Sequence, residues 1–237
     1  MLPVAILAGG LATRLRPITH KIPKALVEVA GKPFVSHQLR YLRRQGFASV
    51  IFCIGYLGEM IQEYVGDGSA WDLKVSYSHD GPALLGTGGA LKQALPMLGE
   101  RFFVLYGDSY LPINYANVQK AFIDSHQLGL MTVLKNKNRW DRSNVQFELG
   151  KLIEYNKEVI NPEMHYIDYG LGALRANVLS GYPDGEPFDL SRVYNELSLQ
   201  QQLLGYEVFN RFYEIGSIQG IADTQTFLLQ QAAKDSL

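Results

Sequence analysis

The feature that most constrains this chain is a glycine pair placed directly behind a short apolar run near the N-terminus. Residues Val4–Leu7 are continuously apolar, which is typical of a strand buried on both faces of a parallel sheet. Ala8, Gly9 and Gly10 follow at once. Because the two glycines lack Cβ atoms, the backbone can turn sharply here and bring its N–H groups close to phosphate oxygens. The sequence therefore predicts an α/β protein with an anion-binding turn after its first strand.

Basic residues gather in the segment that follows the glycine pair. Between Arg14 and Lys32 the chain carries five basic residues and one acidic residue, whereas the whole chain has a formal net charge of −1. Arginine grips phosphate through two parallel hydrogen bonds, and lysine supplies a point charge. Arg14 and Lys24 are therefore candidates for holding a triphosphate. The alternative interpretation is an ordinary strand-to-loop turn followed by a solvated charged segment.

Size, charge and cysteine content narrow the class of protein. A chain of 237 residues with 47% hydrophobic residues can form one large α/β domain, which we expect to span 1–237 with halves of about 1–112 and 113–237. A pI near 6.5 argues against nucleic acid as a partner. The single cysteine, Cys53, lies in an apolar run and is expected to be a buried, inert thiol. The sequence shows neither a basic leader nor a long apolar span, so we expect a cytoplasmic protein with no membrane attachment. Assembly into a homo-oligomer is left open.

Apolar periodicity predicts strands that alternate with helices in the first half of the chain and shorter, antiparallel strands in the second. The expected strands are 4–7, 49–54, 73–77, 101–106, 129–134, 144–149, 151–155, 169–174 and 207–212. The expected helices are 34–45, 58–64, a helix from the glycine-rich turn to about 95, 115–126 and 218–233. Such an order implies a Rossmann-like α/β fold, with a mostly parallel mixed sheet flanked by helices.

Two later segments carry further candidate site residues. The segment 84–91 holds three glycines within four residues, which suits close approach of a flat ligand, although an ordinary turn would use glycines as well. Asp108 follows the predicted strand 101–106, so its carboxylate should lie in the crevice where α/β sheets bind ligands. Capping a helix is the other role open to Asp108, but the helical pattern resumes only near Tyr115.

The basic loop resembles the signature of the sugar-1-phosphate nucleotidylyltransferases, usually G-G-x-G-T-R-L-x-P-x-T followed by P-K. The matching residues are Gly9, Gly10, Thr13, Arg14, Leu15, Pro17, Thr19, Pro23 and Lys24. The chain departs at Ala12, where a third glycine is usual, and because alanine disfavours positive φ we expect a tighter or displaced loop there. The resemblance implies the nucleotide-diphospho-sugar transferase type of fold. It assigns nucleotide contacts to Ala8, Gly9, Gly10, Thr13 and Gly86.

The same resemblance implies roles for the catalytic and metal-binding residues. Arg14 would bind the departing pyrophosphate, and Lys24 would bridge the attacking phosphate and the α-phosphate. Asp108 would bind Mg²⁺ together with Glu214, which stands where the family pattern D-x-G-T has aspartate. A longer carboxylate arm can still reach a metal, and capping the last helix is the other role open to Glu214.

For the sugar half, the resemblance assigns contacts to Glu154, Lys157 and Gly170. Proline usually follows the lysine in the family, whereas Glu158 follows here, so the loop after Lys157 is expected to run differently. Taken alone, Glu154 and Lys157 could equally be a solvated surface pair.

The resulting hypothesis is an enzyme that joins a nucleoside triphosphate to a sugar 1-phosphate, with Mg²⁺ as cofactor and pyrophosphate as second product. The short build resembles guanylyltransferases acting on manno-heptose 1-phosphate, which implies GTP, a heptose or hexose 1-phosphate and a role in cell-envelope polysaccharide. UTP with N-acetylmuramic acid 1-phosphate is an alternative. Another is a cytidylyltransferase for phosphocholine, which the aromatic residues Trp140, Tyr166 and Tyr169 leave open. A non-catalytic regulatory subunit of the same fold is a third, although Arg14, Lys24 and Asp108 are all present.

Overall fold

Nine strands form one mixed sheet in the computed structural model, which describes residues 1–234. The strand order is β10-β9-β11-β6-β1-β4-β5, and β8 pairs with both β11 and β12. These strands are β1 (Val4–Leu7), β4 (Ser49–Ile54), β5 (Lys74–His79), β6 (Arg101–Tyr106), β8 (Gly129–Lys135), β9 (Val145–Glu148), β10 (Lys151–Tyr155), β11 (Tyr166–Arg175) and β12 (Leu203–Val208). The block from β5 to β6 is parallel, and β11 joins it antiparallel to β6.

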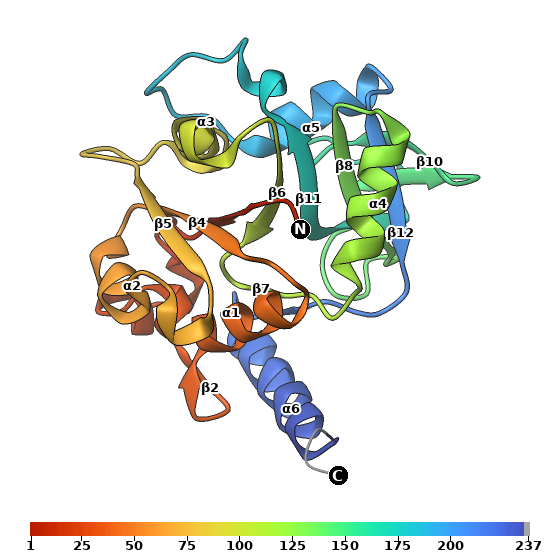
Figure 1. The fold of residues 1–237 in the computed structure, drawn as a ribbon. Helices are drawn as coiled ribbons and strands as arrows, with labels where there is room; N and C mark the ends of the chain where they lie inside the picture. The colour runs from red at the N-terminus through yellow and green to blue at the C-terminus, as the bar shows by residue number, and fades with distance from the viewer. Residues whose placement is uncertain (235–237) are drawn as a thin grey trace.

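Helices cover both faces of this sheet (Figure 1). They are α1 (Phe34–Arg44), α2 (Gly58–Val65), α3 (Gly86–Leu98), α4 (Tyr115–Ser125), α5 (Leu190–Leu199) and α6 (Ile218–Lys234). Residues of α1, α2 and α4 share one buried cluster, and those of α3 and α5 share another. Alternate residues of the central strands enter the two clusters, as Val4 and Ala5 of β1 do. Two covered faces explain why these strands are continuously apolar.

Two short ribbons complete the fold beside the main sheet. β2 (Glu28–Val29) pairs with β3 (Lys32–Pro33), and β7 (Ser109–Tyr110) pairs with β13 (Tyr213–Glu214). The second ribbon brings the end of the chain back to the turn after β6. From there α6 extends away from the sheet and lies beside β2 (Figure 1). Segments from opposite ends of the chain therefore meet at one edge of the molecule.

The fold class expected from the sequence is confirmed, since a mostly parallel mixed sheet is flanked by helices. The strands 4–7, 49–54, 101–106 and 151–155 have the predicted bounds. The strand predicted at 207–212 was wrong in position: β12 begins at Leu203 and ends at Val208, because it pairs in parallel with β8 through this stretch. Helix α5 was not predicted, although Asp189 caps it by accepting a hydrogen bond from the Ser191 N–H (2.8 Å).

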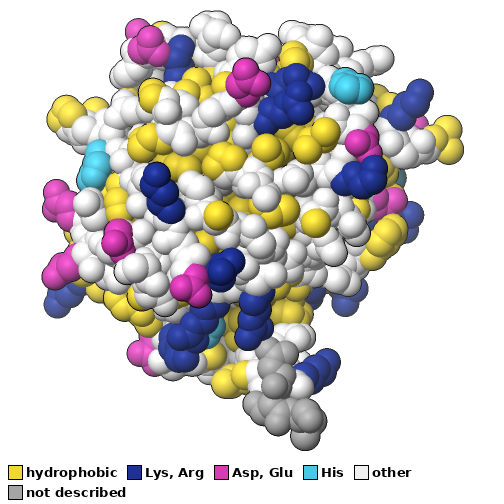
Figure 2. All heavy atoms as spheres, viewed as in Figure 1, with side chains coloured by type: hydrophobic (Ala, Val, Ile, Leu, Met, Phe, Trp, Pro, Cys, Tyr) yellow, Lys and Arg dark blue, Asp and Glu magenta, His cyan; other side chains and the backbone are white. Residues whose placement is uncertain are grey.

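The surface carries interspersed acidic and basic side chains on the face shown in Figure 2, in keeping with the near-neutral net charge. A group of Lys and Arg side chains lies over the region of α1 in this view. Within residues 1–234, no helix combines the length and apolar character needed to cross a bilayer.

Candidate active site

A cavity of about 230 Å³ opens at the carboxyl ends of β1, β4 and β6, the edge where α/β sheets bind ligands. Four of the five predicted nucleotide contacts line it, as do Lys24 and Asp108. The lining residues are Leu7, Ala8, Gly9, Gly10, Ala12, Lys24, Ala25, Cys53, Asp80, Leu84, Gly86, Thr87, Ala90, Tyr106, Gly107 and Asp108. Thr13 and Arg14 lie just beyond it, exposed in the short 3-10 turn Thr13–Leu15.

The loop after β1 has a left-handed residue at the position where alanine replaces the usual third glycine. Ala12 adopts a left-handed conformation with φ of 49°, so the backbone accepts the strain instead of relaxing to negative φ. The carbonyl of Ala12 accepts hydrogen bonds from the Leu15 N–H (3.1 Å) and the Thr19 hydroxyl (2.8 Å). These two bonds hold Ala12 in the left-handed region at the position where the family loop usually has glycine.

Lys24 and Asp108 form an ion pair at the edge of the cavity. The Lys24 Nζ atom lies 2.8 Å from Asp108 Oδ2, and both side chains are partly exposed. Lys24 opens a 3-10 turn directly after Pro23, whereas Asp108 lies in the turn between β6 and β7. Asp108 is not a helix cap, because α4 begins only at Tyr115 and is capped by Asn114. A lysine and a carboxylate at this edge can bind phosphate oxygens and a divalent cation respectively.

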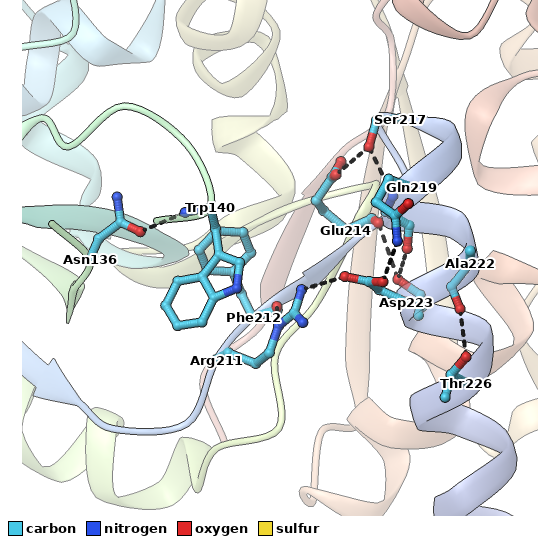
Figure 3. Close-up of polar contacts among 12 residues, drawn as sticks. Asn136, Trp140, Arg211, Phe212, Glu214, Ser217, Gln219, Ala222, Asp223 and Thr226 are labelled. Carbon is cyan, nitrogen blue, oxygen red and sulfur yellow. Dashed lines mark hydrogen bonds and ion pairs between the residues drawn. The ribbon is translucent and has the colours of Figure 1, made fainter. Parts of the chain in front are cut away.

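Glu214 of β13 lies beside Ser217 at the start of α6 (Figure 3). The neighbourhood of Gly216 places it near Arg14 and Asp108 as well. A Cβ atom built on Gly216 would lie 3.3 Å from Arg14 Nη2 and 3.6 Å from Asp108 Oδ2, and closer still to Glu214 Oε2. The Glu214 carboxylate accepts hydrogen bonds from the Gly216 N–H and, at 3.1 Å, from the Ser217 hydroxyl. Glu214 therefore binds the segment that leads into α6, close to Asp108 and Arg14, but it is not among the residues that line the cavity.

The carboxylates of Asp108 and Glu214 fit a magnesium ion that phosphate oxygens of the substrate would help to hold. Mg²⁺ is usually held by one or two carboxylates, with phosphate oxygens and waters completing its octahedron. Asp108 and Glu214 are two such carboxylates. Glu214 lies on β13, and Asp108 immediately precedes β7, the strand that pairs with β13. Within residues 1–234 there is no group of three or more His, Cys, Asp or Glu side chains arranged to hold a metal.

None of the three predicted sugar residues lines the cavity. Gly170, with φ of 105°, lies beside the cleft: a Cβ there would be 3.5 Å from Ser109 Oγ and 3.7 Å from Tyr106 Cδ2. The Glu154 carboxylate accepts hydrogen bonds from the amide groups of Asn156 (3.3 Å) and Asn161 (3.2 Å). Lys157 is exposed just after β10. Neither Glu154 nor Lys157 lines the cavity, so the sugar contacts remain a prediction.

Asp168 is a carboxylate beside the cleft that sequence reasoning did not assign to the site. It precedes the irregular stretch of β11 where the register against β8 shifts, and its Oδ1 atom accepts the Gly170 N–H at 2.9 Å. Burial raises the pKa of Asp168 to about 6, against an opposing effect of the Lys157 charge. The signal in the sequence was the polar residue inside an otherwise apolar strand.

Asp80 is a second carboxylate that the sequence analysis missed. It follows β5, is only 8% exposed and lines the cavity, where Oδ2 accepts the Leu85 N–H at 3.2 Å. Burial raises the pKa of Asp80 above its usual value, and the hydrogen bond from Leu85 opposes that shift. The argument that singled out Asp108, a carboxylate just past a parallel strand, applies to Asp80 equally.

The glycine-rich start of α3 serves close approach of another part of the chain. A Cβ on Gly86, which has φ of 69°, would lie 2.6 Å from the carbonyl oxygen of Phe188, and a Cβ on Gly88 would collide with the Phe188 ring. The Thr87 hydroxyl also accepts the Leu190 N–H at 2.8 Å. The sequence-based explanation, close approach of a flat ligand, is therefore replaced for Gly88 by packing against Phe188. Gly86 still lines the cavity, and its nucleotide contact stays a prediction.

Cys53 is a buried thiol at the end of β4. Burial, with a contribution from the Asp80 charge, raises the pKa of Cys53 to about 12. A thiol with so high a pKa is not a nucleophile at neutral pH. The predicted burial of Cys53 is confirmed.

Comparison with known proteins agrees with this geometry. Residues 4–143 match the nucleotidyl transferase family. The chain is 30% identical to D-glycero-alpha-D-manno-heptose 1-phosphate guanylyltransferase of Campylobacter jejuni over 81% of this chain and 84% of that protein. It is 40% identical to N-acetylmuramate alpha-1-phosphate uridylyltransferase of Neisseria meningitidis, but over only 46% of this chain and 48% of that relative.

Solved structures extend the likeness to the whole fold. HddC from Yersinia pseudotuberculosis, solved in complex with GMP-PN, superposes with a TM-score of 0.76 at 24% identity, covering 96% of this chain and all of that one. The family match covers the strand β1, the basic loop and the turn that carries Asp108. From the sequence match and the shared fold together, the chain belongs to the nucleotidyl transferase family.

Proposed function

We propose that this protein transfers a nucleotidyl group from a nucleoside triphosphate to a sugar 1-phosphate, giving a nucleotide sugar and pyrophosphate. The observation that carries the proposal is the Lys24–Asp108 pair, 2.8 Å apart at the edge of a glycine-lined cavity, with Arg14 and Glu214 beside it. An oxygen of the sugar phosphate attacks the α-phosphorus as the bond to the β-phosphate oxygen breaks. Such a reaction needs positioning and charge neutralisation more than a covalent nucleophile.

The roles of the residues follow from their charges. Arg14, exposed beyond the cavity, neutralises the departing pyrophosphate, and Lys24 draws the attacking phosphate toward the α-phosphate. Asp108 and Glu214 hold Mg²⁺, which when bound would polarise the α-phosphate. Glycine and alanine after β1 leave room for the phosphates to approach backbone N–H groups.

Guanine is the base that we propose for the nucleotide. The lining of the cavity is mostly apolar or glycine, and Asp80 adds a buried carboxylate to it. Guanine presents two adjacent donors, N1–H and the 2-amino group, which a carboxylate can accept together. Uracil and thymine present one N–H between two carbonyl oxygens, which a carboxylate would repel. GTP with a heptose or hexose 1-phosphate is accordingly our preferred pair, and UTP with N-acetylmuramic acid 1-phosphate is the alternative.

A phosphocholine acceptor is disfavoured by the charges around the candidate aromatic residue. The guanidinium groups of Arg139 and Arg211 lie 4.7 and 5.4 Å from the centre of the Trp140 ring. Two cations already occupy the neighbourhood in which a quaternary ammonium would have to bind. We keep a cytoplasmic location and a role in cell-envelope polysaccharide as parts of the proposal.

A substrate panel tests the proposed reaction. Pyrophosphate release is measured for each nucleoside triphosphate with hexose, heptose and N-acetylmuramic acid 1-phosphates and with phosphocholine, with Mg²⁺ or with excess chelator. We expect Lys24→Ala and Arg14→Ala each to lower turnover by about 10²- to 10³-fold, since each removes charge stabilisation in the transition state. Lys120→Ala, which removes an exposed ion pair with Asp124 on α4, is the control. Near-normal turnover in Lys24→Ala would defeat the proposal.

A further inference from the structure

Gln38 occupies a position in α1 where the helix pattern calls for an apolar side chain. Its neighbours on the buried face are Phe34, Val35, Leu39 and Leu42, and Gln38 itself is only 2% exposed. Within residues 1–234, its Oε1 atom is the one fully buried side-chain nitrogen or oxygen without a hydrogen-bond partner. Burying an amide with an unpaired oxygen opposes folding, so packing alone does not account for glutamine here.

The amide nitrogen of Gln38 binds both sides of the turn that carries Asp108. Nε2 donates to the carbonyl oxygen of Tyr106 at 3.1 Å and to that of Ser109 at 2.9 Å. Tyr106 ends β6 and Ser109 begins β7, so only Gly107 and Asp108 lie between the two bonded residues. One side chain thus sets the spacing of the two strand ends from which Asp108 projects.

Two side chains also reach Asp108 itself: Lys24 donates to Oδ2 at 2.8 Å and the Ser109 hydroxyl donates to Oδ1 at 3.4 Å. The remaining hydrogen bonds of this turn come from the backbone. The Gly107 N–H donates to the Leu7 carbonyl at 2.9 Å, and the Ile215 N–H donates to the Asp108 carbonyl at 3.0 Å. These bonds belong to the sheet and to the β7–β13 ribbon and survive any side-chain substitution. Gln38 is therefore the point at which the turn can be loosened without altering a residue that faces the cleft.

We infer that Gln38 is a positioning residue, which fixes the turn between β6 and β7 so that the Asp108 carboxylate meets the metal and Lys24 in one geometry. The inference rests on the proposed function, in which Asp108 is a metal ligand. Residues that orient metal ligands from behind typically change metal affinity or activity by about 10- to 100-fold when replaced. Replacing a residue that only filled the core would change stability and leave the metal affinity unchanged.

The test compares Gln38 with Gln45, the residue that directly follows α1. Gln38→Leu removes both bonds to the turn and also the unpaired oxygen. Gln45→Leu, the control, removes a bond in which the Gln45 side chain accepts the Tyr115 N–H at 3.1 Å, away from the cleft. Binding of Mn²⁺ alone is measured from the electron paramagnetic resonance signal of the free ion. Thermal unfolding, kcat, KM and the Mg²⁺ concentration for half-maximal turnover are measured beside it.

We expect Gln38→Leu to weaken Mn²⁺ binding about tenfold and to lower kcat by a similar factor, with KM for the nucleotide within about twofold. Gln45→Leu should keep wild-type Mn²⁺ binding and kcat whatever its melting temperature. Gln38→Glu supplies a second test: its neutral carboxyl can donate to one carbonyl, whereas its ionised form faces two carbonyl oxygens. Its deficit in kcat should therefore grow as the pH rises.

Wild-type Mn²⁺ binding and kcat in Gln38→Leu would overturn the inference, even if its melting temperature fell. A wild-type protein that binds no Mn²⁺ would overturn it too, because Gln38 would have no metal ligand to position. A wild-type protein that binds Mn²⁺ but releases no pyrophosphate from any substrate pair defeats the proposed function alone. In that case weaker Mn²⁺ binding in Gln38→Leu would still support the positioning role.

Discussion

Asp80 presents its carboxylate to a cavity lined mainly by apolar residues and glycine, so an amide in its place would change hydrogen bonding with little change in shape. Asp80→Asn should lower the ratio of kcat/KM for GTP to that for UTP by about tenfold or more, since a bidentate contact to a base contributes about 1–3 kcal/mol. Asp67→Asn is the matched control, because Asp67 also accepts a backbone N–H, from Ser69, but outside the cleft. An unchanged ratio in Asp80→Asn would assign Asp80 to the turn after β5 alone.

Asp168 should leave a signature in the pH dependence of stability. Its pKa is about 6 in the folded protein, above the value of about 3.9 that an unfolded chain has. The stability that protonated Asp168 contributes is fully present below about pH 4 and is lost as the pH rises through about 6. Asp168→Asn stays neutral, so its free energy of unfolding, relative to wild type, should rise across that window. Urea unfolding at pH 4, 5, 6 and 7 measures the difference, and a constant difference would contradict the shifted pKa.

At the level of individual residues, Lys24 and Asp108 are the two charged cavity-lining residues that the sequence predicted. Lys24 and Asp108 were identified from a motif and a strand end, and they lie 2.8 Å apart. Asp80 was missed although the strand-end argument used for Asp108 applies to it as well. Gln38 was missed because a glutamine in a helix has no distinctive spacing. Only the folded chain brings Leu85 to the first and the turn around Asp108 to the second.

At the scale of elements, Glu214 links the segment that leads into α6 to the neighbourhood of Asp108 and Arg14. Its carboxylate accepts bonds from Gly216 and Ser217, so substitutions should shift the free energy of unfolding by about 1 kcal/mol or less. If Glu214 also holds Mg²⁺, Glu214→Gln should lose more activity than Glu214→Asp, because the amide lacks the charge. A Mg²⁺ titration of both variants ranks them. Equal activity at limiting Mg²⁺ would leave Glu214 as the cap of α6 only.

Elements whose apolar pattern was long and regular were predicted well, and those fixed by pairing were not. Strands β1, β4 and β6 are buried on both faces, so their apolar runs coincide with their bounds. β12 was displaced because its bounds follow from parallel pairing with β8, a partner far away in the sequence. At the start of α3, glycine composition predicted close approach of a flat ligand, whereas Gly88 packs against Phe188, a neighbour that no local pattern could name.

At the scale of the whole molecule, one sheet runs through both proposed halves. β6 pairs with β1 on one side and with β11 on the other, so the first 112 residues alone would expose an apolar strand edge. A fragment of residues 1–112 should therefore aggregate or lack a cooperative unfolding transition. The full chain should unfold in one transition seen alike by circular dichroism and tyrosine fluorescence. A fragment that unfolds cooperatively would mean that the nucleotide half is a domain of its own.

The contact between the start of α3 and the segment around Phe188 limits how members of this family can be recombined. Gly86 and Gly88 leave the space that Phe188 fills, although a hundred residues separate them in the chain. A chimera could combine its first half from one relative with its second half from another. Such a chain would place an unmatched side chain beside Gly86 and Gly88, or larger side chains beside Phe188. A chimera should therefore take residues 85–90 and 186–190 from the same relative if this packing is to be kept.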